Sequence, residues 1–135
     1  MMDAARRIAC EELLEGYCRR IDARDFEGLE AVFAADCVVR YGDVDLVGLP
    51  ALLDYLKAQL VGFAETRHDL GRVEERAEDT TLAKIVAWHR FHPRKGRTRP
   101  DLTLHGRFES RFVDTPAGLR IASHLGSEDR REEGA

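Results

Sequence analysis

The stretch of sequence that decides the fold runs from Tyr17 to Asp36 and reads YCRRIDARDFEGLEAVFAAD. Its first part closes an amphipathic helix expected over residues 4–23, because apolar side chains recur there on one helical stripe. The stripe comprises Ile8, Leu13, Leu14, Tyr17, Cys18 and Ile21. Its second part predicts a short second helix over residues 25–34, with Asp25 as the N-cap. The buried face of this second helix comprises Leu29, Val32 and Phe33.

Working outward toward the C-terminus, one strand and one more helix are expected. Residues 36–41 have strand composition and end at the turn-forming pair Gly42-Asp43. Pro50 suits the first turn of a helix and, with Gly48 before it, opens a third helix over residues 51–63. The inward side chains of this third helix are Leu52, Leu53, Leu56 and Leu60.

From residue 66 onward the apolar pattern changes from helical to alternating, which predicts strands. The expected strands cover residues 66–75, 81–92, 102–113 and 119–125. Glu78-Asp79 and residues 115–118 are interpreted as tight turns, and the basic run 94–99 as a longer hairpin loop. Helices followed by an antiparallel meander are typical of an α+β domain with its helices on one face of the sheet.

Length and charge limit the possible organisation and partners. The chain has 135 residues, and we expect a single domain over residues 1–126. Residues 127–135 are charged and aperiodic, which predicts a disordered tail. The net charge is −4, and no helix carries a clustered basic face. That balance argues against nucleic acid or an anionic membrane as the main partner.

The cysteines indicate a reducing compartment. Cys10, Cys18 and Cys37 are odd in number and lie within apolar patterns, so we interpret them as reduced core residues. A metal site would need closer spacing and a nearby histidine, so no metal is expected. The N-terminus lacks a signal-peptide pattern and no stretch approaches membrane-spanning length, which predicts a cytoplasmic protein.

The second expected strand is apolar on both of its faces. Val86 and Trp88 alternate onto one face. Ile85, Ala87 and Phe91 alternate onto the other face. A strand buried on both faces needs a second cover besides the helices, and a second copy of the chain is the simplest one. The sequence therefore predicts a homodimer through the outer face of the sheet.

Residues 17–36 also match a family pattern. In this pattern a tyrosine and two aspartates come first. They are followed by a leucine, three further residues, a phenylalanine-alanine pair, any one residue and a final aspartate. Further matching segments are Val39-Arg-Tyr41, Gly48, Thr66-Arg-His68, Gly106-Arg-Phe108-Glu109 and Gly118-Leu-Arg-Ile121. In this pattern the chain resembles SnoaL-like domains of the nuclear transport factor 2-like superfamily. The resemblance implies a cone-shaped α+β barrel, in which three N-terminal helices pack on a curved, mostly antiparallel sheet around one cavity. It leaves the reaction open, because one fold hosts many activities.

The resemblance, especially to scytalone dehydratase, implies a catalytic group of Tyr17, Asp22, Tyr41 and His68. Tyr17 matches the oxyanion-hole tyrosine of ketosteroid isomerases, whose site chemistry is a standard example. Tyr41 lies where those isomerases have their aspartate base, which argues against that isomerisation. Asp22 lies near a helix C-terminus, where the dipole disfavours a carboxylate, so we expect it to hydrogen-bond the His68 ring. From the residues alone, structural roles for these side chains remain open.

Three further residues are expected to contact the substrate: His92, His124 and Trp88. His92 and His89 compete for the second histidine position of scytalone dehydratase, and strand alternation puts His89 on the opposite face. His124 occupies a position where several relatives carry an arginine. The roles of Glu109 and Ser110 stay open, because two alignments of this segment differ by a few residues.

These observations predict a dehydratase-like lyase or isomerase that acts on a small apolar hydroxy-carbonyl compound in an internal cavity. In this hypothesis the two tyrosines polarise a carbonyl group or hold a water molecule. His68, oriented by Asp22, then moves the proton, and a hydroxyl leaves as water. No cofactor is expected. The alternatives are a non-catalytic domain for small-ligand binding or assembly, and a polyketide-type cyclase.

Overall fold

A computed structural model of the chain describes residues 3–75, 81–92 and 99–134, with the side chains of residues 73–75 left out. Within these residues the helices are α1 (Ala4–Asp22), α2 (Leu49–Leu60) and the 3-10 helix η1 (Glu27–Ala31). The strands are β1 (Phe33–Tyr41), β2 (Val44–Val47), β3 (Glu65–Glu75), β4 (Thr81–Phe91), β5 (Leu102–Thr115) and β6 (Gly118–Glu133). The expected turn at Glu78-Asp79 and most of the basic run lie outside the described residues.

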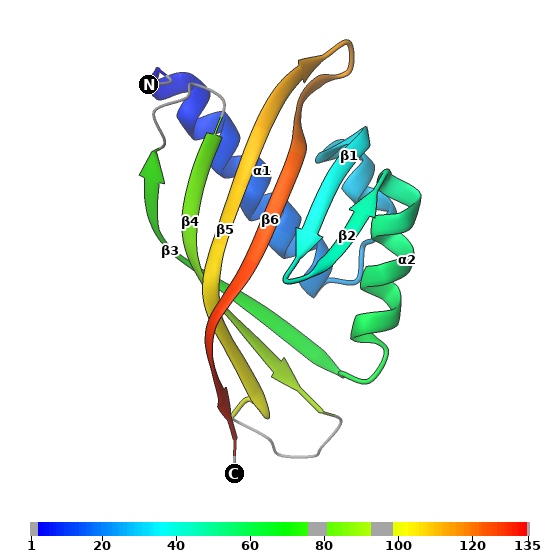
Figure 1. Ribbon diagram of the computed structural model, residues 1–135, viewed down its shortest axis with the longest axis vertical. Helices are drawn as coiled ribbons and strands as arrows, with labels where there is room; N and C mark the ends of the chain where they lie inside the picture. The colour runs from blue at the N-terminus through cyan, green and yellow to red at the C-terminus, as the bar shows by residue number, and fades with distance from the viewer. Residues whose placement is uncertain (1–2, 76–80, 93–98, 135) are drawn as a thin grey trace.

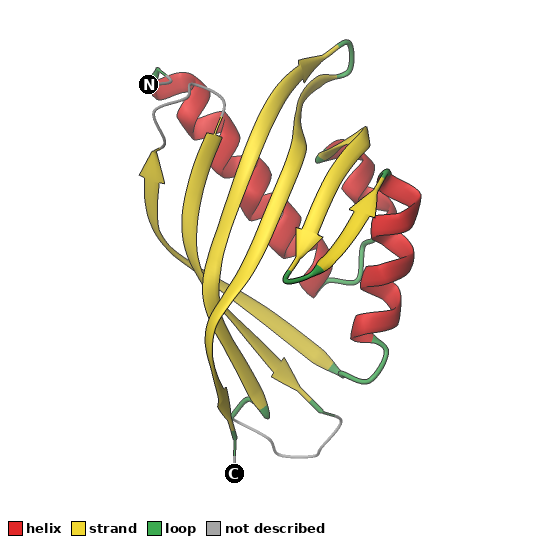
Figure 2. Cartoon of the chain, viewed as in Figure 1, coloured by secondary structure: helices red, strands yellow, loops and turns green. Residues whose placement is uncertain are grey.

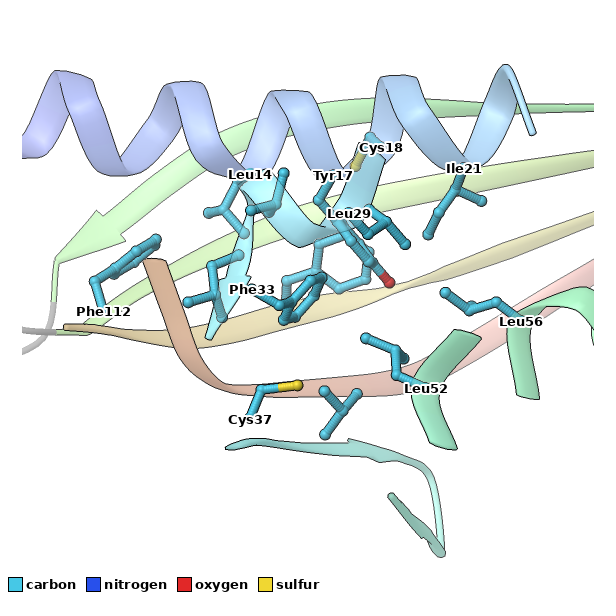
Figure 3. Packing of buried hydrophobic residues seen from close by; sticks show 14 of the residues in the cluster. Leu14, Tyr17, Cys18, Ile21, Leu29, Phe33, Cys37, Leu52, Leu56 and Phe112 are labelled. Carbon is cyan, nitrogen blue, oxygen red and sulfur yellow. The ribbon is translucent and has the colours of Figure 1, made fainter. Parts of the chain in front are cut away.

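The long helix α1 forms as predicted and covers the sheet. Asp3 caps it, because its side chain accepts a hydrogen bond from the backbone N–H of Arg6 at 2.8 Å. Figure 3 shows the buried side chains of this helix pointing together into the core. They include Leu14, Tyr17, Cys18 and Ile21.

The expectation of three helices is wrong, because the described residues form two α-helices. The predicted second helix is a five-residue 3-10 segment, η1. A helix this short gains little from its own hydrogen bonds, and Gly28 lowers its propensity further. The apolar residues just beyond it join the sheet, since Phe33 opens β1 and pairs with Ile121.

The six strands form one sheet in the order β2-β1-β6-β5-β4-β3. All neighbours are antiparallel except β1 and β6, which run parallel, so the sheet is mixed and mostly antiparallel as expected. Figures 1 and 2 show the strands bending strongly midway, with α1 crossing behind one half and α2 beside β1 and β2. Strand β2, which the sequence pattern did not predict, follows a tight turn in which Gly42 takes a φ of 62°.

The predicted disordered tail is wrong over residues 127–133, because these residues continue strand β6. They pair with the first half of β5, as in the register Leu104↔Arg131. Backbone hydrogen bonding to an adjacent strand does not depend on side-chain hydropathy, so a charged segment can complete a sheet. The charges are also paired: Arg131 contacts Glu128 at 2.8 Å, for example.

All three cysteines are free and buried, as predicted. Burial raises the pKa of Cys10 to about 11 and raises the pKa of Cys18 and Cys37 as well. These thiols therefore stay protonated at neutral pH and act as small apolar core residues.

Candidate functional site

A cavity of about 320 Å³ lies between α2, the β1–β2 turn and the inner face of the sheet. Its inner lining includes Tyr17, Tyr41, His68, Trp88 and Phe108. The lining also includes Tyr55, Leu56 and Gln59 of α2. The cavity is predominantly apolar and has the size of a small-molecule site.

The predicted hydrogen bond between Asp22 and His68 is present. Asp22 is the last residue of α1, and its Oδ1 lies 2.9 Å from Nδ1 of the His68 ring. Its other oxygen accepts the backbone N–H of His68 at 2.8 Å. Because a carboxylate only accepts, the hydrogen-bond network assigns the ring proton to Nδ1. The second ring nitrogen, Nε2, is then the unprotonated one, in a side chain that lines the cavity.

Two further side chains orient the Asp22 carboxylate. The hydroxyl of Thr66 donates to Oδ1 of Asp22 at 2.9 Å, and Nη1 of Arg24 donates to the Thr66 hydroxyl at 2.8 Å. Arg24 has a φ of 62°, uncommon for a residue other than glycine, and its Nη1 also donates to the Ile21 carbonyl. This chain of contacts satisfies a carboxylate that the helix dipole alone would disfavour.

Tyr17 and Tyr41 meet inside the cavity, with 2.5 Å between their hydroxyl oxygens. Burial raises the pKa of both phenols, so both stay protonated at neutral pH. One hydroxyl donates to the other, and the accepting hydroxyl keeps its own proton for another partner. Gly126 leaves room for this arrangement, since a Cβ there would lie 3.0 Å from the Tyr41 ring.

Trp88 lies beside His68, as the pairing of β3 with β4 requires. The two rings stack with their centroids 4.8 Å apart and their planes 15° apart. Trp88 lines the cavity, as the sequence predicted for a substrate contact. The indole N–H is buried and has no hydrogen-bond partner among the described residues.

The prediction that His92 contacts the substrate is wrong. β4 ends at Phe91, so alternation no longer directs the next side chain, and His92 is exposed. Its ring stacks on Phe63 at 4.9 Å, outside the cavity lining. His89 lies on the opposite face of β4, as expected, and contacts Asp69 at 2.7 Å.

His124 does not contact the cavity either, which corrects its predicted role as a substrate contact. It is 2% exposed and enclosed by aromatic rings, with Tyr17 at 4.8 Å and Phe108 at 4.6 Å between centroids. Its Nδ1 lies 2.7 Å from the hydroxyl of Ser110, which gives that residue a supporting role. Burial, with a smaller contribution from the nearby His68, lowers the pKa of His124 to about 3.

Several cavity residues were not identified from the sequence. Arg90 follows Trp88 by two residues on the same strand, so strand alternation could have indicated it. Glu128 and Arg131 line the cavity from the segment that was expected to be disordered. Across the described residues, His, Cys, Asp and Glu side chains do not gather in groups of three that could hold a metal ion.

A SnoaL-like domain model matches residues 2–124, and the chain therefore belongs to the SnoaL-like family. An uncharacterised protein of Mycobacterium tuberculosis is 30% identical over 121 residues, which cover 85% of this chain and 80% of that protein. These matches confirm the family resemblance.

Solved structures share the fold at low sequence identity. A candidate scytalone dehydratase from Novosphingobium aromaticivorans has a TM-score of 0.80 at 19% identity, covering 97% of this chain and 89% of that one. A type 2 hexachlorocyclohexane dehydrochlorinase also has a TM-score of 0.80, at 15% identity, covering 97% and 90%. At these identities the similarity establishes the fold, that of the nuclear transport factor 2-like superfamily. Neither described α-helix has the length and apolar character needed to cross a membrane.

Proposed function

We propose that the protein is a lyase or isomerase that removes a proton next to a carbonyl group, with water elimination as its main reaction. The observation that carries the proposal is the Asp22–His68 pair beside two protonated phenols in one cavity. The pair supplies a base, and the phenols supply donors for a developing enolate oxygen.

In the proposed reaction a small, mostly apolar β-hydroxy ketone enters the cavity with its carbonyl oxygen toward Tyr17 and Tyr41. Nε2 of His68 takes the proton from the α-carbon, and the electrons of that C–H bond move toward the carbonyl oxygen. The enolate then collapses, the β-carbon–oxygen bond breaks and a carbon–carbon double bond forms. The departing hydroxyl takes the proton back from His68 and leaves as water.

Asp22 contributes to this reaction by orienting the base. Its hydrogen bond to Nδ1 of His68 favours the tautomer with a free Nε2 and stabilises the imidazolium that forms during proton transfer. Two neighbours of this fold are named for eliminations, a dehydratase and a dehydrochlorinase, which supports the same class here.

Two small probes test the proposal. With 3-hydroxycyclohexanone, loss of water gives cyclohex-2-enone, which ultraviolet absorbance detects. With cyclohexanone in D₂O, proton transfer alone replaces the α-hydrogens with deuterium, which NMR detects. Elimination supports the dehydratase, whereas exchange without elimination supports an isomerase.

His68→Ala should lower either rate at least about a hundredfold, the usual contribution of a general base. His92→Ala is the matched control, because His92 is exposed and lies outside the cavity lining. Neither elimination nor exchange by the wild type, or unchanged rates in His68→Ala, would overturn the proposal in favour of a binding domain.

A further inference from the structure

Arg90 is a cation embedded in the wall of the cavity. It lies on β4 two residues after Trp88, and both side chains line the cavity. The guanidinium carbon lies 4.1 Å from the Trp88 ring centroid and 5.3 Å from that of Phe63. These contacts hold the guanidinium against the aromatic wall.

The hydrogen-bonding capacity of Arg90 is not used within the described part of the chain. The described carboxylates form no ion pair with Arg90, although the charge of nearby Glu128 favours the cation, and its buried Nε has no acceptor there. Burial lowers the pKa of Arg90, which reflects the partial loss of its hydration. Arg90 is half-buried, and its buried Nε has no acceptor, so a bound anion would replace part of the hydration that the group has lost.

Unlike Arg90, the other charged residues near it in the cavity lining are already paired or exposed to water. Arg131, also in the lining, is held by Glu128 through two hydrogen bonds of 2.8 and 3.0 Å. Asp43 lies in the exposed turn between β1 and β2. The carboxylate of Glu128 is therefore already neutralised, and that of Asp43 is screened by water.

We propose that the cavity takes a small apolar compound that carries a carboxylate, and that Arg90 binds this carboxylate through its planar donors. The proposal deepens the proposed function, on which it rests for the chemistry at the other end of the ligand. His68 pairs directly with Trp88 in the sheet, and two residues of strand span about 7 Å. The Trp88 ring contacts both the His68 ring and the Arg90 guanidinium, so the carboxylate and the reacting carbon would lie along the same wall of the cavity.

Binding of two isosteric probes tests this inference without any turnover. Cyclohexanecarboxylate and cyclohexanecarboxamide have the same shape and differ in charge, and neither absorbs where tryptophan emits. The chain has one tryptophan, Trp88, so its fluorescence reports occupancy of the cavity directly. At pH 7 the carboxylate should bind at least about tenfold more tightly than the amide, as expected for a charge-assisted hydrogen bond.

Arg90→Met keeps much of the apolar stem and should reduce the preference for the carboxylate to less than about twofold. Arg107→Gln, a control on an exposed arginine of β5 outside the cavity, should keep the full preference. Equal affinities of the wild type for the two probes would overturn the inference, even if Arg90→Met failed to fold. A folded Arg90→Met that retains the preference would overturn it as well. A carboxylate preference without elimination or proton exchange would leave this inference standing and remove the proposed reaction.

Discussion

The carboxylate of Asp22 and the imidazole of His68 lie 2.9 Å apart, although 46 residues separate them in the chain. One residue ends α1, and the other lies near the start of β3. The same carboxylate also accepts the backbone N–H of His68, so the strand and the ring are positioned by one group. Because of these two contacts, the packing of α1 against β3 sets the orientation of the His68 ring.

The first prediction concerns the tautomer of His68. In the wild type, ¹H–¹⁵N NMR should place the ring proton on Nδ1, because Oδ1 of Asp22 can only accept. Asp22→Asn replaces one acceptor oxygen by a donor, so the tautomer should shift toward Nε2–H and kcat should fall at least about tenfold. An unchanged tautomer and an unchanged kcat in Asp22→Asn would contradict the orienting role.

Thr66→Val should destabilise the fold by about 1.5–3 kcal/mol, measured by urea unfolding. The substitution removes a buried hydroxyl that donates to the Asp22 carboxylate and accepts from Arg24. Thr66→Ser keeps the hydroxyl and is the matched control, with an expected loss well below that of valine. A loss in Thr66→Val no larger than that in Thr66→Ser, which lacks only the methyl group, would contradict the role of the hydroxyl.

The buried His124 should make the fold sensitive to acid. Burial lowers its pKa from 6.5 to about 3, so between these values the unfolded chain binds a proton that the folded chain does not. Stability from this group is therefore complete above pH 6.5 and is lost as the pH falls, by up to about 1.4 kcal/mol per pH unit.

Urea unfolding between pH 6 and pH 4 checks this prediction. The free energy of unfolding of the wild type should fall more steeply than that of His124→Gln, by roughly 1 kcal/mol per pH unit. His92→Gln, at an exposed position, should follow the wild type. Parallel curves for the wild type and His124→Gln would show that residue 124 does not contribute to acid sensitivity.

Deletion of residues 127–135 should lower the free energy of unfolding by at least about 2 kcal/mol. The deletion removes the strand that pairs with residues 102–107 and leaves their backbone groups without partners. The double variant Arg130→Gln, Glu132→Gln keeps the strand and removes only the surface contacts of Glu132 with Arg130 and His105, so it should change stability by less than about 1 kcal/mol. A deletion without effect would restore the interpretation of this segment as a disordered tail.

The expected homodimer remains a prediction. Ile85 is 40% exposed on the outer face of β4, whereas Phe91 of the same face is buried and needs no second cover. Light scattering should give twice the chain mass of 15.3 kDa, and Ile85→Arg should halve the measured mass. Val61→Arg, at an apolar position that is 87% exposed just beyond α2, should leave the mass unchanged. A wild-type mass of 15.3 kDa would rule the dimer out.

The sequence alone was sufficient for the elements whose burial follows a regular period. The stripe of α1 and the alternation of β4 predicted most of the inward side chains, because periodicity reflects burial along one element. Ile8, which was assigned to the stripe of α1, is instead 56% exposed near the start of that helix. The position of Asp22 at a helix C-terminus, together with the family pattern, predicted its contact with His68. The family-model match over residues 2–124 confirms the resemblance that this pattern indicated.

Only the tertiary structure decided features that depend on a partner distant in the chain. Residues 127–133 become a strand because β5 offers them unpaired backbone groups, which the charge pattern of the segment does not encode. His124 is enclosed by rings from three other elements. The sequence of β6 alone could therefore not show whether this side chain reaches the cavity. The length of η1 was likewise decided by β1, which takes up Phe33 through pairing with Ile121. In each case the physical reason is that side-chain burial and strand pairing depend on contacts between elements, whereas sequence periodicity reflects only one element at a time.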